Sequence, residues 1–69
     1  MIWVVIRGAM ERNGIKSIAE LARRTGIKKA TLTQTRRKNP YSFLLWEIRE
    51  IDKILHFTNV EWLLIGDKI

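Results

Sequence analysis

A glycine divides residues 18–35, IAELARRTGIKKATLTQT, into two short segments that each have the apolar spacing of a helix. The predicted apolar contacts with the protein interior are Ile18, Leu21, Ala22, Ile27, Ala30 and Leu32. One helix is predicted over about residues 18–25 and the next over about residues 28–37, with Gly26 at the turn between them. Two short helices joined in this way are typical of a helix-turn-helix, whose second helix projects from the body of the protein.

The positive charge of the chain is concentrated around this glycine. Residues 16–39 contain eight basic residues and one acidic residue, a net charge of +7. The remainder contains five basic and six acidic residues, a net charge of −1, and the two parts give the total of +6. A positive field concentrated in one third of the chain attracts a polyanion. This distribution favours a nucleic-acid-binding face over lysines and arginines that merely solvate helices.

The rest of the 69-residue chain also has the apolar spacing of helices. A first helix is predicted over residues 2–10, with Asn13 and Gly14 ending it. Capping boxes of the form Ser/Thr-x-x-Glu mark helix starts at residues 17–20 and 58–61. The whole pattern predicts an all-α fold in which residues 1–69 form a single domain, a five-helix orthogonal bundle that contains the helix-turn-helix.

The fourth predicted helix begins near Ser42 and is the most hydrophobic. Its apolar side chains are Leu44, Leu45, Ile48, Ile51, Ile54 and Leu55. We interpret its acidic residues Glu47, Glu50 and Asp52 as a solvated face with ion-pair partners such as Lys53. The fifth helix is predicted to carry the apolar residues Val60, Trp62, Leu63 and Ile65.

Composition argues against several classes of function. The absence of cysteine excludes a disulfide framework, a thiolate zinc site and a thiol nucleophile. The apolar N-terminus, MIWVVI, is too short to span a membrane. The sequence has no phosphate-binding loop, no metal-ligand spacing and no nucleophile with an adjacent base. We therefore expect a cytoplasmic protein that is not an enzyme and needs no metal, cofactor or small-molecule ligand.

The motif resembles the helix-turn-helix of lambdoid phage Cro proteins and repressors, often called the XRE family. Residues at the family's fixed positions are Leu21, Ala22, Gly26, Ile27 and Leu32. Asn39 and Pro40 resemble the loop after the recognition helix, and residues 59–68, NVEWLLIGDK, are similar to the closing helix of these domains. The resemblance covers nearly the whole chain and implies a lambda-repressor-like fold that binds DNA.

The resemblance implies that the recognition helix, about residues 28–37, lies in the major groove. Base contacts are then expected from Lys28, Lys29, Ala30, Thr31 and Gln34. A lysine can donate to guanine, a glutamine can bind adenine through two hydrogen bonds, and the alanine methyl can contact that of thymine. Contact with phosphate alone is the alternative for the two lysines. Thr33 is expected to face the backbone or water.

Phosphate contacts are expected on both sides of the recognition helix. Before it, they come from Ser17 and the backbone amides around Ile18, because a helix N-terminus favours an anion. After it, they come from Arg36, Arg37, Lys38, Asn39 and Tyr41. The sequence departs from the family at Ile18, where a phosphate-binding glutamine is usual. It also departs at Thr35, where an apolar residue commonly ends the inner face of the recognition helix.

The function expected from the sequence is that of a sequence-specific regulator of transcription, a Cro-like repressor that occupies a double-stranded DNA operator in a phage or prophage setting. A homodimer is expected, at least on DNA, with the last helix, the C-terminal tail and the aromatic residues Trp3 and Trp46 as candidate contacts. No separate ligand-sensing domain is expected, because the motif occupies most of the chain. The alternatives are a helix-turn-helix module that binds a protein, such as an antitoxin or anti-repressor, and a binder of nucleic acid or membrane surfaces through charge alone.

Overall fold

The computed structural model describes residues 2–66, and all regular structure within them is helical. The elements are α1 (Ile2–Arg12), α2 (Ile18–Thr25), η1 (Thr31–Arg36), η2 (Pro40–Ser42), α3 (Leu45–Leu55) and α4 (Asn59–Gly66). The segment η1 is the π-helical centre of a helix over residues 29–38, which we call the recognition helix, and η2 is a single 3₁₀ turn. The prediction of an all-α fold with five helices is confirmed.

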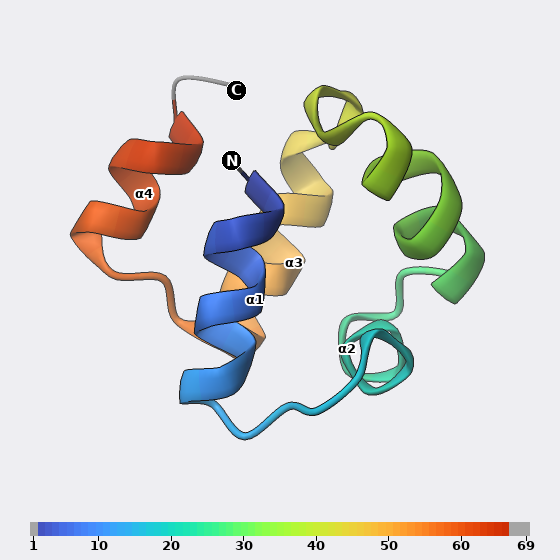
Figure 1. The fold of residues 1–69 in the computed structure, drawn as a ribbon, viewed down its shortest axis with the longest axis horizontal. Coiled ribbons are helices and arrows are strands. Elements are labelled where there is room, and N and C mark those ends of the chain that lie inside the picture. The colour runs from blue at the N-terminus through green and yellow to red at the C-terminus, as the bar shows by residue number, and fades with distance from the viewer. Residues whose placement is uncertain (1, 67–69) are drawn as a thin grey trace.

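The helices are arranged around α1 (Figure 1). In this view α1 lies in the middle, α4 lies on its left, and α2 and the green recognition helix lie on its right. Helix α1 packs against α3 and α4, whereas α2 packs against α3 and η1. The helix-turn-helix therefore occupies one side of the bundle, and α3 connects it to the rest of the core.

The core is formed by the apolar stripes of these helices. Its fully buried large side chains include Ile2, Ile6, Leu21, Leu32, Ile48, Ile51, Leu55 and Ile65. The predicted inner face of the first helix is confirmed, because the buried residues of α1 are Ile2, Val5, Ile6, Ala9 and Met10. Burying one such side chain contributes about 1.5–3 kcal/mol. This core holds the helix-turn-helix in place.

Helix ends follow the predicted capping chemistry fully at Thr58 and in part at Ser17, where the Glu20 carboxylate accepts from the Lys16 N–H at 3.5 Å instead of from the Ser17 N–H. The Ser17 hydroxyl accepts a hydrogen bond from the Glu20 backbone N–H at 3.1 Å. At the second box, Thr58 and Glu61 bond reciprocally, at 3.2 Å to the Thr58 hydroxyl and 2.7 Å to the Glu61 carboxylate. Gly14 has a φ of 71°, a left-handed conformation that ends the turn after α1.

Two predictions about the fourth helix are wrong. Helix α3 begins at Leu45 rather than near Ser42, because Pro40 starts a separate 3₁₀ turn that is closed by the bond from the Ser42 N–H to the Asn39 carbonyl at 3.0 Å. Leu44 and Leu45 consequently lie outside the core and are 49% and 45% exposed.

The acidic residues of α3 are only partly a solvated face. Glu50 pairs with Lys53 at the surface at 3.1 Å, as expected. Asp52, in contrast, accepts a hydrogen bond from the Phe57 N–H at 3.0 Å, and Glu47 is buried at 2% exposure. In α4, the predicted apolar stripe is also divided, since Ile65 is buried whereas Val60 and Leu63 are exposed.

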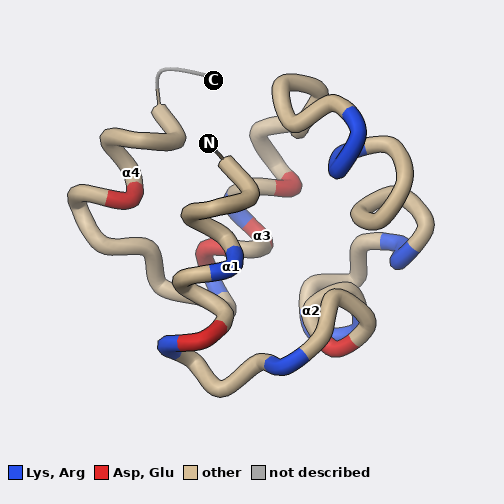
Figure 2. The backbone as a smooth tube through the Cα atoms, viewed as in Figure 1, with Lys and Arg blue, Asp and Glu red and all other residues tan. Residues whose placement is uncertain are grey.

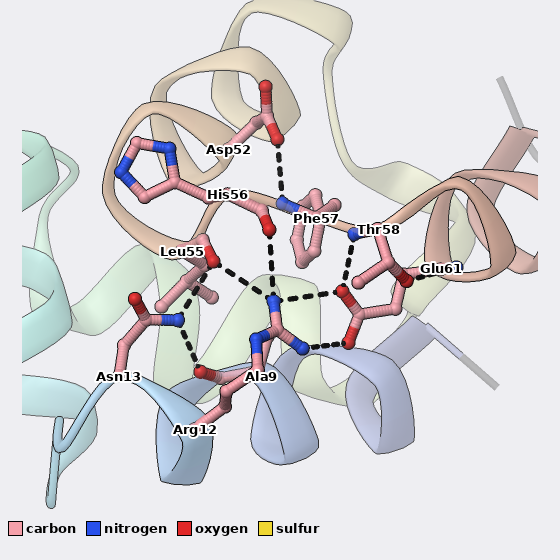
Figure 3. A network of polar contacts seen from close by, with 9 residues as sticks. All are labelled: Ala9, Arg12, Asn13, Asp52, Leu55, His56, Phe57, Thr58 and Glu61. Carbon is pink, nitrogen blue, oxygen red and sulfur yellow. Dashed lines mark hydrogen bonds and ion pairs between the residues drawn. The ribbon is translucent and has the colours of Figure 1, made fainter.

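A polar network joins the end of α1 to the connection between α3 and α4 (Figure 3). The Arg12 guanidinium bonds to both Glu61 carboxylate oxygens, at 2.7 and 3.0 Å, and to the carbonyls of Leu55 and His56 at 3.1 and 2.9 Å. The Asn13 side-chain amide donates to the carbonyls of Ala9 and Leu55. The last carbonyls of α3 are therefore satisfied by groups from α1.

This network predicts a dependence of stability on acid pH. Hydrogen bonds from Arg12 and then from the Thr58 backbone hold the pKa of Glu61 below its ordinary value of 4.5. A carboxylate whose pKa is lowered in the folded state stabilises that state above the unfolded pKa, and the effect is lost as pH falls through the folded pKa. Urea unfolding should show wild type more stable than Glu61→Gln at about pH 6, with the difference shrinking below about pH 4. A difference independent of pH would contradict this assignment.

Candidate nucleic-acid interface

The turn between α2 and the recognition helix is fixed by Gly26 and Thr25. Gly26 has a φ of 78° and donates its N–H to the Ala22 carbonyl at 2.9 Å. The buried Thr25 hydroxyl donates to the Leu21 carbonyl at 2.9 Å and accepts from the Ile27 N–H at 3.3 Å. The predicted role of Gly26 is confirmed, whereas the contribution of Thr25 was not foreseen.

The recognition helix is attached by its inner face and exposes the opposite one. Leu32 is completely buried, and Ile27 is buried at the corner just before the helix. Of the predicted base-contacting residues, Lys28, Lys29, Ala30 and Gln34 are exposed and Thr31 is partly buried. The structure therefore brings four of these five side chains to the surface, three on the recognition helix and Lys28 directly before it. The separate prediction that Ala30 is an apolar contact of this helix is wrong, because Ala30 is exposed.

Thr33 is engaged with its own helix. Its hydroxyl donates to the Lys29 carbonyl at 2.9 Å, one turn earlier. Such a bond back to the preceding turn occupies the hydroxyl hydrogen. This agrees with the expectation that Thr33 faces the backbone or water.

At the start of α2, the predicted phosphate contacts come from the side chain of one residue and the backbone of the next. Ser17 is exposed, whereas the Ile18 side chain is partly buried against the core. Ile18 can therefore bind an anion through its backbone N–H and not through its side chain. The Glu20 carboxylate lies near the same helix end, where its Oε1 accepts from the Lys16 N–H at 3.5 Å and its Oε2 pairs with Arg24 at 2.9 Å.

After the recognition helix, exposed residues gather at its C-terminal end. Arg37, Lys38 and Asn39 are exposed, and the Tyr41 side chain on η2 is 64% exposed. All four are among the residues from which phosphate contacts were predicted, and their exposure is compatible with that role.

Arg36 is placed differently from its neighbours. Its Nε and Nη2 donate to the two Glu47 carboxylate oxygens at 2.8 and 3.1 Å, and its Nη1 donates to the Ser42 hydroxyl at 3.3 Å. Trp3 donates its indole N–H to the Arg36 carbonyl at 3.0 Å. The side chains of the ion pair are 14% and 3% exposed, so the Arg36 guanidinium points inward rather than to solvent.

Glu47 was therefore misinterpreted as a solvated residue. It also accepts the Leu44 N–H at 2.8 Å, which satisfies a backbone donor at the start of α3. A signal for its burial exists in the sequence: Glu47 stands four residues before Ile51 and eight before Leu55, on the stripe that faces the core.

Basic and acidic residues are separated between the helix-turn-helix and the other helices (Figure 2). Basic residues lie along α2 and at both ends of the recognition helix, on the right of the view. Among the residues that the structure describes, every acidic residue except Glu20 lies in α1, α3 or α4. The recognition helix and α2 thus share one positively charged side, on which Arg23 and Arg24 of α2 are exposed as well.

Within residues 2–66 no group of three or more histidine or acidic residues could hold a metal ion. None of the helices in that range is long and apolar enough to cross a membrane. In comparisons with known proteins, a family model described as a Cro/C1-type helix-turn-helix DNA-binding domain matches residues 5–61. No curated protein and no solved structure matches the chain. The chain belongs to the family of Cro/C1-type helix-turn-helix DNA-binding domains.

Proposed function

We propose that the protein is a sequence-specific regulator of transcription that acts as a Cro-like repressor by occupying a double-stranded DNA operator. The observation that supports this most strongly is the exposed face of the recognition helix. Lys29, Ala30 and Gln34 are exposed on a helix whose Leu32 is completely buried, and Lys28 is exposed directly before this helix. A helix anchored in this way can enter the major groove and present polar side chains to base edges.

The proposed base contacts follow from side-chain chemistry. Gln34 binds adenine through two hydrogen bonds, and Lys28 or Lys29 donates to guanine or to a phosphate. Ala30 lies against a thymine methyl, and the Thr31 hydroxyl bonds at the edge of the helix. Each well-placed pair discriminates between bases by about 1–3 kcal/mol.

The proposed phosphate contacts are fewer than the sequence suggested. They comprise Ser17 with the Ile18 amide, and Arg37, Lys38, Asn39 and Tyr41. Arg36 is not among them, because its guanidinium is engaged with Glu47 and Ser42. The cationic members of this set are Arg37 and Lys38. If Lys28 and Lys29 also neutralise phosphates, about four are neutralised, and the logarithm of the affinity should fall against log salt with a slope of about −3.6.

A homodimer on DNA is part of the proposal. Two copies would contact half-sites about one helical turn apart, roughly 34–36 Å. The exposed Val60 and Leu63 on α4 and the exposed Trp46 on α3 offer candidate contacts. Trp3 is less suitable, because it is partly buried against the core, and the predicted contribution of the tail concerns residues 67–69, outside the described residues.

Selection of bound duplexes from a random pool tests the function. The selected duplex should retain binding in the presence of excess random DNA and should bind two chains. Equal binding to all duplexes would support attachment through charge alone. A protein that shifts no duplex at low salt would instead support the alternative of a protein-binding module.

Two variants separate base contact from phosphate contact. Gln34→Ala should weaken preference at one base position by about 1–3 kcal/mol and leave the salt slope unchanged. Arg37→Ala should weaken binding to all duplexes alike and reduce the magnitude of the slope by about 1. Competition titrations at several salt concentrations measure both quantities. Equal losses on every duplex for both variants would contradict base contact by Gln34.

A further inference from the structure

We propose that Thr35 is an additional DNA-contacting residue next to Gln34, and that the buried ion pair between Arg36 and Glu47 fixes its outward position. This inference rests on the proposed function and extends the contact surface beyond the residues expected from the sequence. Three observations support it: the π-helical stretch, the contacts of Arg36, and the hydroxyl of Thr35, which is not hydrogen-bonded as that of Thr33 is.

The π-helical stretch changes which residues follow one another on the helix surface. In an α-helix, Thr35 and Arg36 stand three and four residues after the buried Leu32, and both flank the inner face. The π-helical bonds of η1 join a backbone N–H to a carbonyl five residues earlier instead of four, so Thr35 lies about one turn after the exposed Ala30. Arg36 is accordingly the residue that turns inward, and Thr35 is exposed.

The contacts of Arg36 resist rotation of this turn. The guanidinium holds Glu47 through two hydrogen bonds, and the Arg36 carbonyl accepts the Trp3 indole N–H. The Trp3 ring in turn packs against Phe43, with ring centroids 5.6 Å apart. Turning Arg36 outward would leave the Glu47 carboxylate buried without its counter-charge, which is strongly unfavourable. The ion pair therefore keeps Thr35 on the outer face.

The Thr35 hydroxyl is available to a ligand, whereas that of Thr33 is engaged. Thr33 donates to the Lys29 carbonyl at 2.9 Å. Thr35 is exposed, and its hydroxyl makes no hydrogen bond with any residue in the range 2–66. A threonine hydroxyl can bond to a base edge or to a phosphate oxygen. Beside Gln34 it would extend the polar face of the recognition helix by one contact.

The matched substitutions Thr35→Val and Thr33→Val test this contact on the duplex that wild type selects. Both remove a hydroxyl and keep the branched shape. Thr35→Val should weaken binding about 3- to 10-fold, the effect of one lost hydrogen bond, whereas Thr33→Val should stay within about twofold. A base contact would appear as relaxed preference at one position, and a phosphate contact as an equal loss on every duplex. The salt slope should not change in either case, because no charge is removed.

A double-mutant cycle tests the role of the ion pair. Replacing it by the apolar pair Arg36→Met with Glu47→Leu removes the charges without leaving one unpaired, a change that is often tolerated. In this background, Thr35→Val should alter binding by less than about twofold. Trp3→Phe, which removes the indole N–H, gives a second and milder background in which the effect should decrease. Circular dichroism confirms that each variant is folded before binding is measured.

Two outcomes would overturn the inference while leaving the proposed function intact. In the first, wild type selects a duplex but Thr35→Val and Thr33→Val bind it equally well. In the second, the effect of Thr35→Val persists undiminished in both altered backgrounds, so that the ion pair does not position Thr35. A wild-type protein without any preferred duplex would instead overturn the proposed function itself.

Discussion

Replacing Glu47 with alanine should lower the free energy of unfolding by about 3–5 kcal/mol, the usual result of removing one partner of a buried ion pair. The Glu47 side chain is 3% exposed and accepts from the Arg36 guanidinium and the Leu44 backbone N–H. Its removal leaves the Arg36 charge in a mostly buried position and a backbone donor without its acceptor. Both groups lose a partner that water cannot readily replace.

An effect of this size is a large fraction of the free energy of unfolding of so small a protein. At roughly 0.05–0.15 kcal/mol per residue, a chain of this length is stable by about 3–10 kcal/mol. Urea unfolding followed by circular dichroism should therefore show a midpoint far below that of wild type for Glu47→Ala. Glu50→Ala is the matched control on the same helix, because the pair between Glu50 and Lys53 is exposed and contributes about 0.5 kcal/mol or less. Similar losses for the two variants would contradict the buried role of Glu47.

The parts of the fold that the sequence predicted correctly depend on local chemistry. The apolar stripe of α1, the helix caps at Ser17 and Thr58 and the left-handed glycines are each defined by residues a few positions apart. Such signals need no knowledge of the tertiary structure. They sufficed to predict five helices and to place the turn at Gly26.

The misassigned residues depend on contacts between distant segments. Glu47 finds its partner eleven residues away and Trp3 finds the Arg36 carbonyl thirty-three residues away, and neither pairing has a sequence pattern. Leu44 and Leu45 were predicted to be apolar contacts of the fourth helix because that helix was expected to begin near Ser42, but both are exposed. Their exposure follows from the 3₁₀ turn at Pro40, because α3 begins after this turn, at Leu45 instead of near Ser42.

The sequence also could not predict which residue near the end of the recognition helix faces the core. The spacing from Leu32 could not decide whether Thr35 or Arg36 turns inward, because both lie on the same side of a regular helix. The choice depends on the π-helical stretch and on the acceptor that Glu47 supplies from α3. Arg36 consequently changes from an expected phosphate contact into a structural residue.

Replacing Leu32 with alanine should cost about 2–5 kcal/mol of stability. Leu32 is completely buried and is the residue of η1 that enters the core. The change removes apolar contacts and leaves a cavity whose cost depends on how far neighbouring side chains can collapse into it. The measurement is again urea unfolding, with Leu44→Ala as the control, since Leu44 is 49% exposed and its truncation should cost clearly less.

The position of Leu32 also links stability to DNA binding. The side chains proposed to contact bases project from the same helix that Leu32 fixes to the body, so a loosened helix holds them less accurately. At a temperature where Leu32→Ala is still folded, preference for the selected duplex should fall more than affinity for random DNA, because the basic residues remain and phosphate attraction tolerates imprecise positioning. Competition titrations of both duplexes measure this difference. Equal losses on both would show that Leu32 contributes to folding alone and that other contacts orient the recognition helix.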